Sequence, residues 1–254
     1  MATELYALPL GDCSCPFEVV APGVHDGMRA HIPVTGYLIK LPDDRLALVD
    51  TGMNRLHVDD PDLTWRGTPA ADALKPVMRP EDSLLYRLSQ LEIGPEDIDY
   101  VINTHLHFDH AGNNDLLSDS TFFVQREQYE LAKNNPSYPN QYWNLPALSY
   151  ELVDGEQTLF DDVSVIPTPG HTEGHQSVLL RLPETGALII CGDAVYCQEN
   201  YDHDTWTSQA DPETARESAL KLKARADQEK AMMFYGHDRE QAHSMRWAPT
   251  DSYK

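Results

Sequence analysis

The sequence predicts an α+β fold in which two β-sheets pack face to face with helices outside, all in one domain over residues 1–254. Short apolar runs typical of buried strands form two groups along the chain, and helices are attached to each group. No Ser- or Gly-rich linker and no low-complexity segment divides the chain. With 254 residues, 41% of them apolar, the chain can build one sizeable core.

The first group of predicted elements ends near residue 133. Apolar runs bounded by turn residues predict strands at 5–10, 35–40, 45–50, 98–103 and 121–125, and helices at 80–94 and 126–133. The first of these helices has leucines spaced along one face and ends at Gly94. Residues 12–33 are expected to form a loop. Residues 53–80 are expected to form a long irregular connection, which in compact domains is often a lid or a binding loop.

The second group follows an aromatic-rich loop predicted at 134–147. Strands are predicted at 163–168, 176–182, 187–192 and 231–235. A helix is expected from Asp211 to about Asp227, because Asp followed by Pro is a typical helix start. The aromatic loop could cover an edge of the core or form the wall of an apolar pocket.

Three histidines and an aspartate occur within six positions, in the run His105-Leu106-His107-Phe108-Asp109-His110. The run follows the strand predicted at 98–103. Alternate side chains of an extended backbone share a face, so His105 and His107 point the same way. Imidazole nitrogens and carboxylate oxygens are ligands of the kind that Zn²⁺ takes. A chance polar loop is disfavoured, since no packing requirement brings these groups to one strand end.

Three further ligand-type side chains, each preceded by glycine, follow other predicted strands: His171, Asp193 and His237. If all these strand ends lie along one sheet edge, seven ligating side chains converge, which suits two metal ions rather than one tetrahedral Zn²⁺. We expect the first ion on His105, His107 and His171. We expect the second ion on Asp109, His110 and His237, with Asp193 bridging the two.

Other polar residues near these strand ends are assigned different roles. His175 is expected to be a structural or outer histidine rather than a ligand. Asp50, followed by Thr51-Gly52, either makes an ordinary turn or orients a metal-binding histidine, and the local pattern favours the turn. The remaining histidines have no supporting pattern and are expected at the surface: His25, His31, His57, His203 and His243.

Composition narrows the possible partners and compartment. A formal charge of −22 and a pI near 4.6 disfavour nucleic acid and anionic membranes as partners. No signal peptide or membrane-length apolar run is visible, so a cytoplasmic location is expected. Four cysteines are too few for a disulfide scaffold, and Cys191 is expected to be a core thiol. An exposed aromatic loop leaves a homodimer possible.

The pattern His-x-His-x-Asp-His, with a later Pro-Gly-His, Gly-Asp and Gly-His, resembles the metallo-β-lactamase superfamily over most of the chain. The resemblance implies a four-layer αββα sandwich with a dinuclear metal site on the shared sheet edge. It supports the ligands named above residue by residue. Two Zn²⁺ ions are expected, although this ligand set also accepts Co, Mn or Fe.

Within the superfamily the chain looks most like the N-acyl-homoserine lactone lactonases, which are quorum-quenching enzymes. The matching runs include 48–53, 105–112, 168–171, 174–177, 193–196 and 234–238. The resemblance places the substrate-positioning tyrosine of these enzymes at Tyr196. Loop position suggests further substrate-binding residues around the acyl chain, although each could equally be core: Met53, Trp65, Phe108 and Trp143.

The predicted activity is hydrolytic opening of the lactone ring of N-acyl-homoserine lactones. A hydroxide bridging two Zn²⁺ ions would attack the carbonyl, while one metal and the Tyr196 hydroxyl hold the developing oxyanion. The second metal would stabilise the leaving alkoxide. Asp109 is the expected catalytic group that carries a proton to this alkoxide.

Three alternatives remain beside this prediction. The first is a hydrolase of another lactone, and the second a thioesterase like glyoxalase II. Tyr196 and the early end of the chain argue against the thioesterase, since that resemblance implies an added helical domain. The third is a metal-binding sensor without turnover, which the complete ligand set and the open coordination it implies disfavour.

Overall fold

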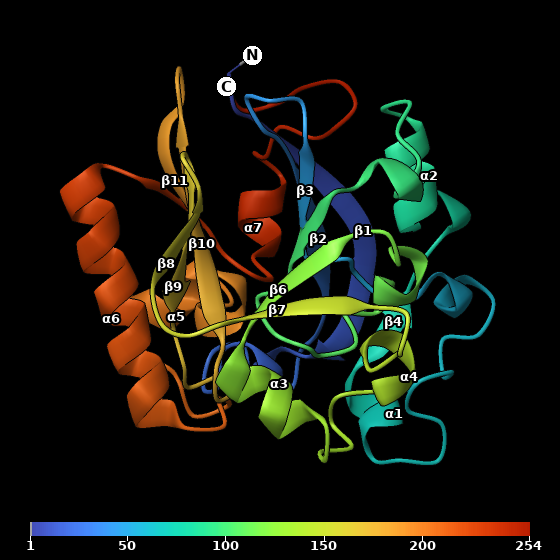
Figure 1. The fold of residues 1–254 in the computed structure, drawn as a ribbon. Helices are drawn as coiled ribbons and strands as arrows, with labels where there is room; N and C mark the ends of the chain where they lie inside the picture. Colours follow the sequence, from blue (N-terminus) through green and yellow to red (C-terminus); the bar gives the residue numbers. More distant parts are fainter. Residues whose placement is uncertain (1) are drawn as a thin grey trace.

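A computed structural model describes residues 2–254, with residue 72 described by its backbone only. Two β-sheets face each other, and helices lie on the outer side of each sheet (Figure 1). Helix α6 (Pro212–Glu229) covers one sheet, and helix α2 (Leu84–Ser89) covers the other. The predicted αββα sandwich is confirmed.

The first sheet is mixed and, within the described residues, has seven strands. In spatial order they are β4 (Lys75–Val77), β1 (Glu4–Pro16), β2 (Arg29–Lys40), β3 (Leu46–Val49), β5 (Tyr100–Ile102), β6 (Thr121–Gln125) and β7 (Ser149–Val153). Strands β3, β5, β6 and β7 run parallel to one another, and the other pairs are antiparallel. Because β3 and β5 are parallel neighbours, the residues that follow both strands meet at one edge.

The second sheet has five strands in the same described part of the chain. Their order is β12 (Met232–Phe234), β11 (Gly186–Ile190), β10 (Gln176–Leu182), β9 (Val163–Pro167) and β8 (Gln157–Phe160). Strands β11 and β12 are parallel, and the other pairs are antiparallel. Strands β9, β11 and β12 therefore deliver the residues after them to the same end of this sheet.

The remaining helices are short. They are α1 (Ala70–Ala73), α3 (Arg126–Ala132), α4 (Asn140–Trp143), α5 (Gln198–Asp202) and α7 (Arg239–Ala242), with 3₁₀ turns at Phe17–Val19, Arg55–Val58, Pro80–Asp82, Pro95–Asp97, Asn114–Leu116 and Gly192–Ala194. Helix α6 begins as predicted, because the Asp211 carboxylate accepts the Thr214 N–H and Pro212 occupies the first position. It ends at Glu229, and the residue that follows, Lys230, has a left-handed φ of 54°.

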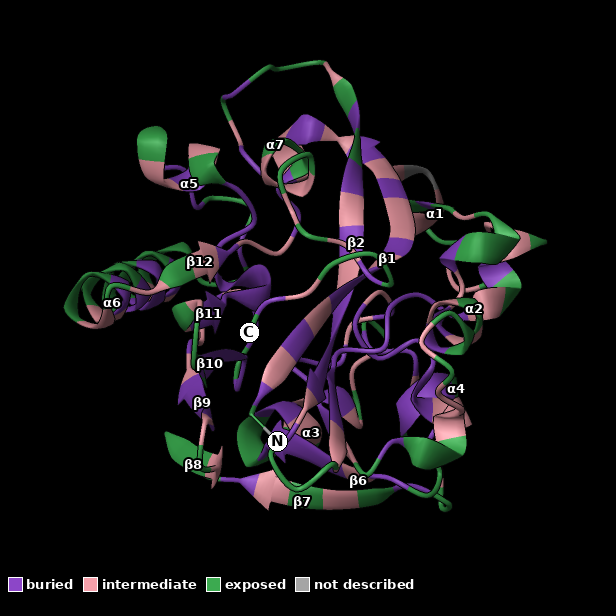
Figure 2. Cartoon of the chain, turned by 90° about the horizontal axis from the view of Figure 1, so that it is seen from above, coloured by how far each residue is buried: buried purple, intermediate pink, exposed green. Residues whose placement is uncertain are grey.

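Three layers of apolar side chains hold the sandwich together, and Figure 2 shows burial concentrated on the strands between the helices. The central layer lies between the sheets, where Ile39 and Val49 belong to the same cluster as Val178 and Ile190. Outer layers lie under α2 and under α6. The inner end of β2 is buried on both faces, with Leu38 in the layer under α2 and Tyr37 and Ile39 in the central layer.

Some predicted elements differ from the structure. The loop expected at 12–33 is wrong at both ends, because β1 and β2 continue as a ribbon that pairs Cys13 with Ile32 and Cys15 with Ala30. The helix expected at 80–94 is shorter, since Ser83 interrupts it and caps α2 through the Tyr86 N–H. The sequence analysis did not predict β4, β7 or β8, which are edge strands with exposed polar residues; β4 lies within the connection expected to be irregular at 53–80.

Cys13, Cys15, Cys191 and Cys197 are all buried free thiols, and Cys191 lies in the layer under α6 as expected. Over residues 2–254, no helix combines the length and the apolar character needed to cross a membrane.

Candidate metal centre

The seven predicted ligands come together where the two sheets meet. Four of them follow β5 in the first sheet, and the other three follow β9, β11 and β12 in the second. They form two groups of neighbouring ligand atoms, His105/His107/His171/Asp193 and Asp109/His110/His237. This division is the one that the sequence predicted, including the assignment of each histidine to its group.

Glycines before two of these ligands allow the close approach. A Cβ at Gly236 would lie 2.7 Å from the Gly192 carbonyl oxygen and 2.8 Å from Asp193 Oδ1. At Gly192, whose φ is +55°, a Cβ would lie 2.8 Å from His175 Nε2. The Gly-Asp and Gly-His pairs of the sequence therefore have a steric cause, because a larger residue would push the two strand ends apart.

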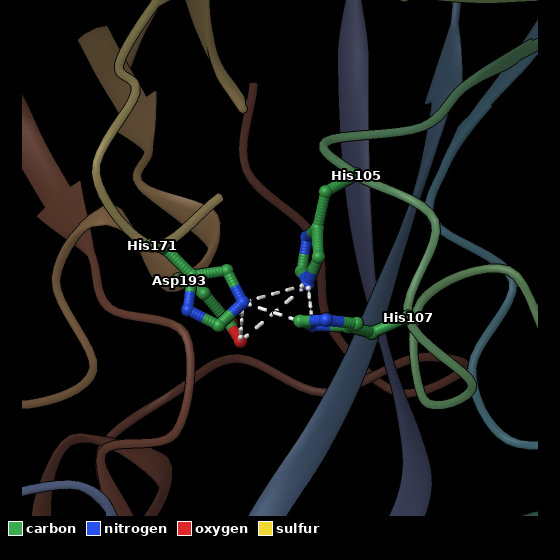
Figure 3. A group of neighbouring side chains, drawn as sticks. All are labelled: His105, His107, His171 and Asp193. Carbon is green, nitrogen blue, oxygen red and sulfur yellow. Dashed lines mark hydrogen bonds and ion pairs between the residues drawn. The ribbon is translucent and has the colours of Figure 1, made fainter. Parts of the chain in front are cut away.

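Figure 3 shows the first group, in which three ring nitrogens point at one another and at a carboxylate. His171 Nε2 lies 2.9 Å from His107 Nδ1 and 3.1 Å from His105 Nε2. The latter two atoms are 3.0 Å apart. Asp193 Oδ2 lies 3.3 Å from His171 Nε2 and 3.6 Å from His105 Nε2. Ligands about 2.0 Å from a tetrahedral ion are separated by about 3.3 Å, so these spacings suit one ion.

The second group shares the Asp193 carboxylate through its other oxygen. Asp193 Oδ1 lies 3.2 Å from both His110 Nε2 and His237 Nε2. Asp109 Oδ2 lies 3.8 Å from His110 Nε2 and 3.7 Å from His237 Nε2. Asp193 thus presents one oxygen to each group, which is the arrangement expected of a bridging ligand.

Unpaired buried atoms support a cation at this position. His110 Nε2 and Asp193 Oδ1 are buried 3.2 Å from each other, and among residues 2–254 neither makes a hydrogen bond of good geometry. Buried polar atoms are rarely left unsatisfied without a functional reason or an ion that binds them. The donor set of imidazoles and carboxylates, its spacing and these unpaired atoms all fit divalent metal.

The outward nitrogens of the ligand rings have partners that set each tautomer. His110 Nδ1 lies 2.7 Å from Asp50 Oδ2, and His237 Nδ1 lies 2.8 Å from the Pro33 carbonyl oxygen. His171 Nδ1 lies 2.9 Å from Gln209 Oε1. With the proton on each of these Nδ1 atoms, the Nε2 lone pairs face the metal groups.

Asp50 has the outer role that the local pattern had disfavoured. Its carboxylate accepts hydrogen bonds from the Thr104 N–H at 2.8 Å and the Thr104 hydroxyl at 2.7 Å, as well as facing His110. Asp50 also turns the chain, with a φ of 55°. The two interpretations left open by the sequence are therefore both true of this residue.

Two further histidines are buried: His175, which was expected to be structural, and His57, which was expected at the surface. His175 is a structural residue: its Nε2 accepts the Asp193 N–H at 3.0 Å, and its Nδ1 lies 2.9 Å from Thr168 Oγ1. Burial lowers the pKa of His175 to about 3, so the ring is neutral. The surface prediction for His57 was wrong, because this ring is buried and its Nε2 lies 2.8 Å from Thr64 Oγ1.

Electrostatics within the site follow from burial and mutual proximity. The pKa values of His105 and His107 lie well below that of an ordinary histidine. Burial is the main cause, and the neighbouring histidines lower these pKa values further. Burial opposes ionisation of Asp193, but His110 and His237 outweigh it and lower the pKa of that carboxyl. Burial raises the pKa of Tyr196 well above its ordinary value, so its hydroxyl keeps its proton.

An apolar cavity of about 270 Å³ opens onto both groups. Of the predicted substrate-binding residues, Trp65, Phe108 and Tyr196 line it, and the ring centroids of Trp65 and Phe108 are 5.5 Å apart. Met53 and Trp143 do not line it. Met53 is packed in the core against the Cys13 thiol, and Trp143 fills the core under α3 and α4.

Sequence reasoning missed several residues that line this cavity: Val19, Val20, Ile32, Ala70, Leu74 and Ser137. They lie on β2, in the connection between β1 and β2, in the 53–80 connection and in the 134–147 loop. No local pattern identifies them, because each faces the cavity only through tertiary packing. The prediction that residues 53–80 contribute a binding loop agrees with the positions of Trp65, Ala70 and Leu74.

Residues 31–237 match the family model described as the metallo-beta-lactamase superfamily. The chain belongs to this superfamily. An N-acyl homoserine lactonase of Bacillus thuringiensis is 34% identical, with 97% of both chains covered, and one of Bacillus cereus is 35% identical, with 94% of both covered.

Solved structures agree with this assignment. The structure of an N-acyl homoserine lactone hydrolase with the product N-hexanoyl-L-homoserine bound at its catalytic metal center superimposes with a TM-score of 0.92. It is 33% identical, and the match covers 100% of each chain. The metallo-beta-lactamase fold together with the His/Asp groups marks a divalent metal site in this chain.

Proposed function

We propose that this chain is a hydrolase that opens the lactone ring of N-acyl-homoserine lactones. The observation that carries the proposal is the pair of ligand groups sharing Asp193, placed at the end of an apolar cavity that Tyr196 and Asp109 also line. The curated relatives named above are N-acyl homoserine lactonases, and one related structure holds a ring-opened product at its metal centre.

Residues around the cavity have different roles in binding the substrate and opening its ring. The apolar wall with Trp65 and Phe108 holds the acyl chain, because burying methylene groups there removes them from water. The buried Tyr196 hydroxyl, which keeps its proton, donates to the lactone carbonyl oxygen as negative charge develops on it. Asp109 lines the cavity beside the second group, where its carboxylate takes up the proton released by the attacking water and passes it to the leaving ring oxygen.

We infer two zinc ions as the bound metal. His105, His107 and His171 would hold one ion, Asp109, His110 and His237 the other, with Asp193 between them. When bound, the ions lower the pKa of water toward neutrality and polarise the carbonyl. The unpaired thiols support a reducing, cytoplasmic location. A homodimer, and the absence of nucleic-acid and membrane partners, stay predictions of the sequence.

A substrate panel tests this proposal. Zinc-loaded protein is offered acyl-homoserine lactones, simple γ-lactones and thioesters, and proton release is followed at constant pH. The proposal expects ring opening of acyl-homoserine lactones at the highest kcat/KM. Preference for thioesters would replace the substrate class, and protein that binds two metals without turning over any of these compounds would identify a sensor instead.

A further inference from the structure

Gln209 is a buried side chain that contacts both a ligand of the first group and the loop of the bridging carboxylate. Its Oε1 lies 2.9 Å from His171 Nδ1, and its Nε2 donates to the Asp193 carbonyl oxygen at 3.2 Å. It is 5% exposed and lies in the connection before α6. No local sequence pattern identifies it, because both contacts are with residues distant in the chain.

The segment around Gln209 is fixed to the His171 loop by main-chain contacts. The Asp211 N–H donates to the Gly170 carbonyl oxygen at 2.9 Å, and the Gln209 N–H donates to the Trp206 carbonyl oxygen at 3.0 Å. A Cβ at Gly170 would lie 2.2 Å from the Ala215 nitrogen, so α6 packs directly on this loop. Gln209 is therefore held at a set distance from His171 by the fold.

The amide orientation of Gln209 follows from its second contact. A carbonyl oxygen only accepts hydrogen bonds, so the Gln209 NH₂ group must face Asp193 O, and Oε1 must then face His171. An oxygen acceptor at Nδ1 requires the proton of the neutral His171 ring to be on Nδ1. The Nε2 lone pair is then directed at His105, His107 and Asp193.

Tyr196 competes for the same ring nitrogen. Its hydroxyl oxygen lies 2.9 Å from His171 Nδ1. Without an acceptor at position 209, the Tyr196 hydroxyl can donate to Nδ1, and the ring proton then moves to Nε2. That tautomer blocks the metal-facing atom and commits the hydroxyl proton to the ring instead of the cavity.

We propose that Gln209 is a positioning residue that fixes the His171 tautomer for metal binding and leaves the Tyr196 hydroxyl proton free for substrate. The first half rests on the ligand geometry alone. The second half rests on the proposed lactonase function. The contacts to His171 and to Asp193 separate the roles of the amide oxygen and the amide nitrogen, so single-atom changes can test them.

Two variants at this position, with a control elsewhere, make the test specific. Gln209→Met keeps the length of the side chain and removes both contacts, whereas Gln209→Glu keeps an oxygen acceptor for His171 and removes the donor to Asp193. Gln125→Met is the matched control. Gln125 is also 5% exposed and bonds Gly155 and Gln176, and it is not among the ligands.

Metal affinity is measured first, by competition between each protein and a chromophoric zinc chelator. We expect Gln209→Met to weaken one of the two ions about 10- to 100-fold, which is the usual effect of removing a hydrogen-bond partner of a ligand. Gln209→Glu should bind zinc with the wild-type affinity. Gln125→Met should lower the melting temperature but leave the zinc affinity unchanged. Equal affinities in wild type and Gln209→Met would overturn the proposal, and so would a Gln209→Glu protein as weak as Gln209→Met.

The Tyr196 part is tested by kinetics at saturating zinc. If Gln209 keeps the hydroxyl proton available, Tyr196→Phe costs less in kcat when Gln209→Met is already present than in wild type. Independent, multiplicative losses would refute this part. If wild type binds two ions but opens no lactone, the proposed function fails, while the affinity measurements still decide the role of Gln209 toward His171.

Discussion

Replacing Asp50 with asparagine should weaken the second metal group while leaving the fold intact. Asp50 accepts three hydrogen bonds, two from Thr104 and one from His110. In Asp50→Asn, the amide oxygen can still accept the Thr104 N–H, and the Thr104 hydroxyl can rotate to accept from the new NH₂ group. The same NH₂ group faces His110 Nδ1, whose N–H donates a hydrogen bond to the carboxylate in the wild type.

The ring of His110 then has to change its tautomer. Paired with an NH₂ donor, Nδ1 becomes an acceptor, and the proton moves to Nε2, which faces Asp193 Oδ1 at 3.2 Å. A hydrogen bond to a charged group contributes about 1.5–3 kcal/mol. If metal binding loses about 2 kcal/mol, the affinity falls roughly 30-fold. This is inside the range of about 10- to 100-fold that is typical when a hydrogen-bond partner of a metal ligand is removed.

The assay is zinc competition on Asp50→Asn, beside Asp82→Asn as a matched control. Asp82 is equally buried and hydrogen-bonded, but its partners are Arg79 and Arg87 rather than a ligand. We expect one ion to bind about 30-fold more weakly in Asp50→Asn, and neither ion to change in Asp82→Asn, which loses only stability. Unchanged binding of both ions in Asp50→Asn would refute the tautomer argument.

Four further predictions test other parts of the molecule. Tyr196→Phe should lower kcat/KM about 100-fold with zinc content unchanged, because one donor to the oxyanion is lost; steady-state kinetics with metal analysis checks this, and unchanged kinetics would remove its role. Burial lowers the pKa of His57. Below about pH 6.5 the His57 ring is therefore protonated in the unfolded chain but not in the folded chain, so the free energy of unfolding falls as the pH falls. In urea unfolding across pH 5–8, His57→Gln should reduce this loss, and an identical pH slope would count against it. Gly170→Ala should destabilise the fold by about 3 kcal/mol or more, because φ is +126° and the new Cβ meets α6. At Gly186, where φ is also positive but the space is open, alanine should cost about 1–2 kcal/mol; equal costs in thermal unfolding would contradict the steric argument. Removing metal with a chelator should lower the melting temperature, and free zinc at about 100 times its Kd should restore about 2.7 kcal/mol per site; a melting temperature independent of zinc would show that the groups do not hold it.

The two groups of metal-binding side-chain types were predictable because their residues form recognisable local patterns in the sequence. His105, His107, Asp109 and His110 are neighbours in the chain, and each remaining ligand follows a recognisable strand and a glycine. Strands β6 and β10 were predicted with their exact bounds, since each is a buried run bounded by turn residues. Burial on both faces gives such strands a continuous apolar signal that needs no knowledge of neighbours.

The residues around the ligands were not predictable in this way. Gln209 and Pro33 are separated from the histidines they contact by 38 and 204 positions. The β1–β2 ribbon is similar: Cys13 and Cys15 continue the strand because Ile32 and Ala30 pair with them, although Gly11 indicated an end. At Gly11, φ is +95° and the register shifts, so the strand bulges where the sequence predicted that it stops.

The position of the metal centre explains why the two sheets have to be arranged as they are. Each ligand group takes members from both sheets: the first combines His105 with His171, and the second combines His110 with His237. Neither sheet alone offers more than two histidines to either group. Asp193 joins the groups because β11 ends between β10 and β12, in the interior of its sheet rather than at an edge. A shift of one sheet against the other would therefore open both groups at once, so the central apolar layer that fixes the sheets also fixes the geometry of the site.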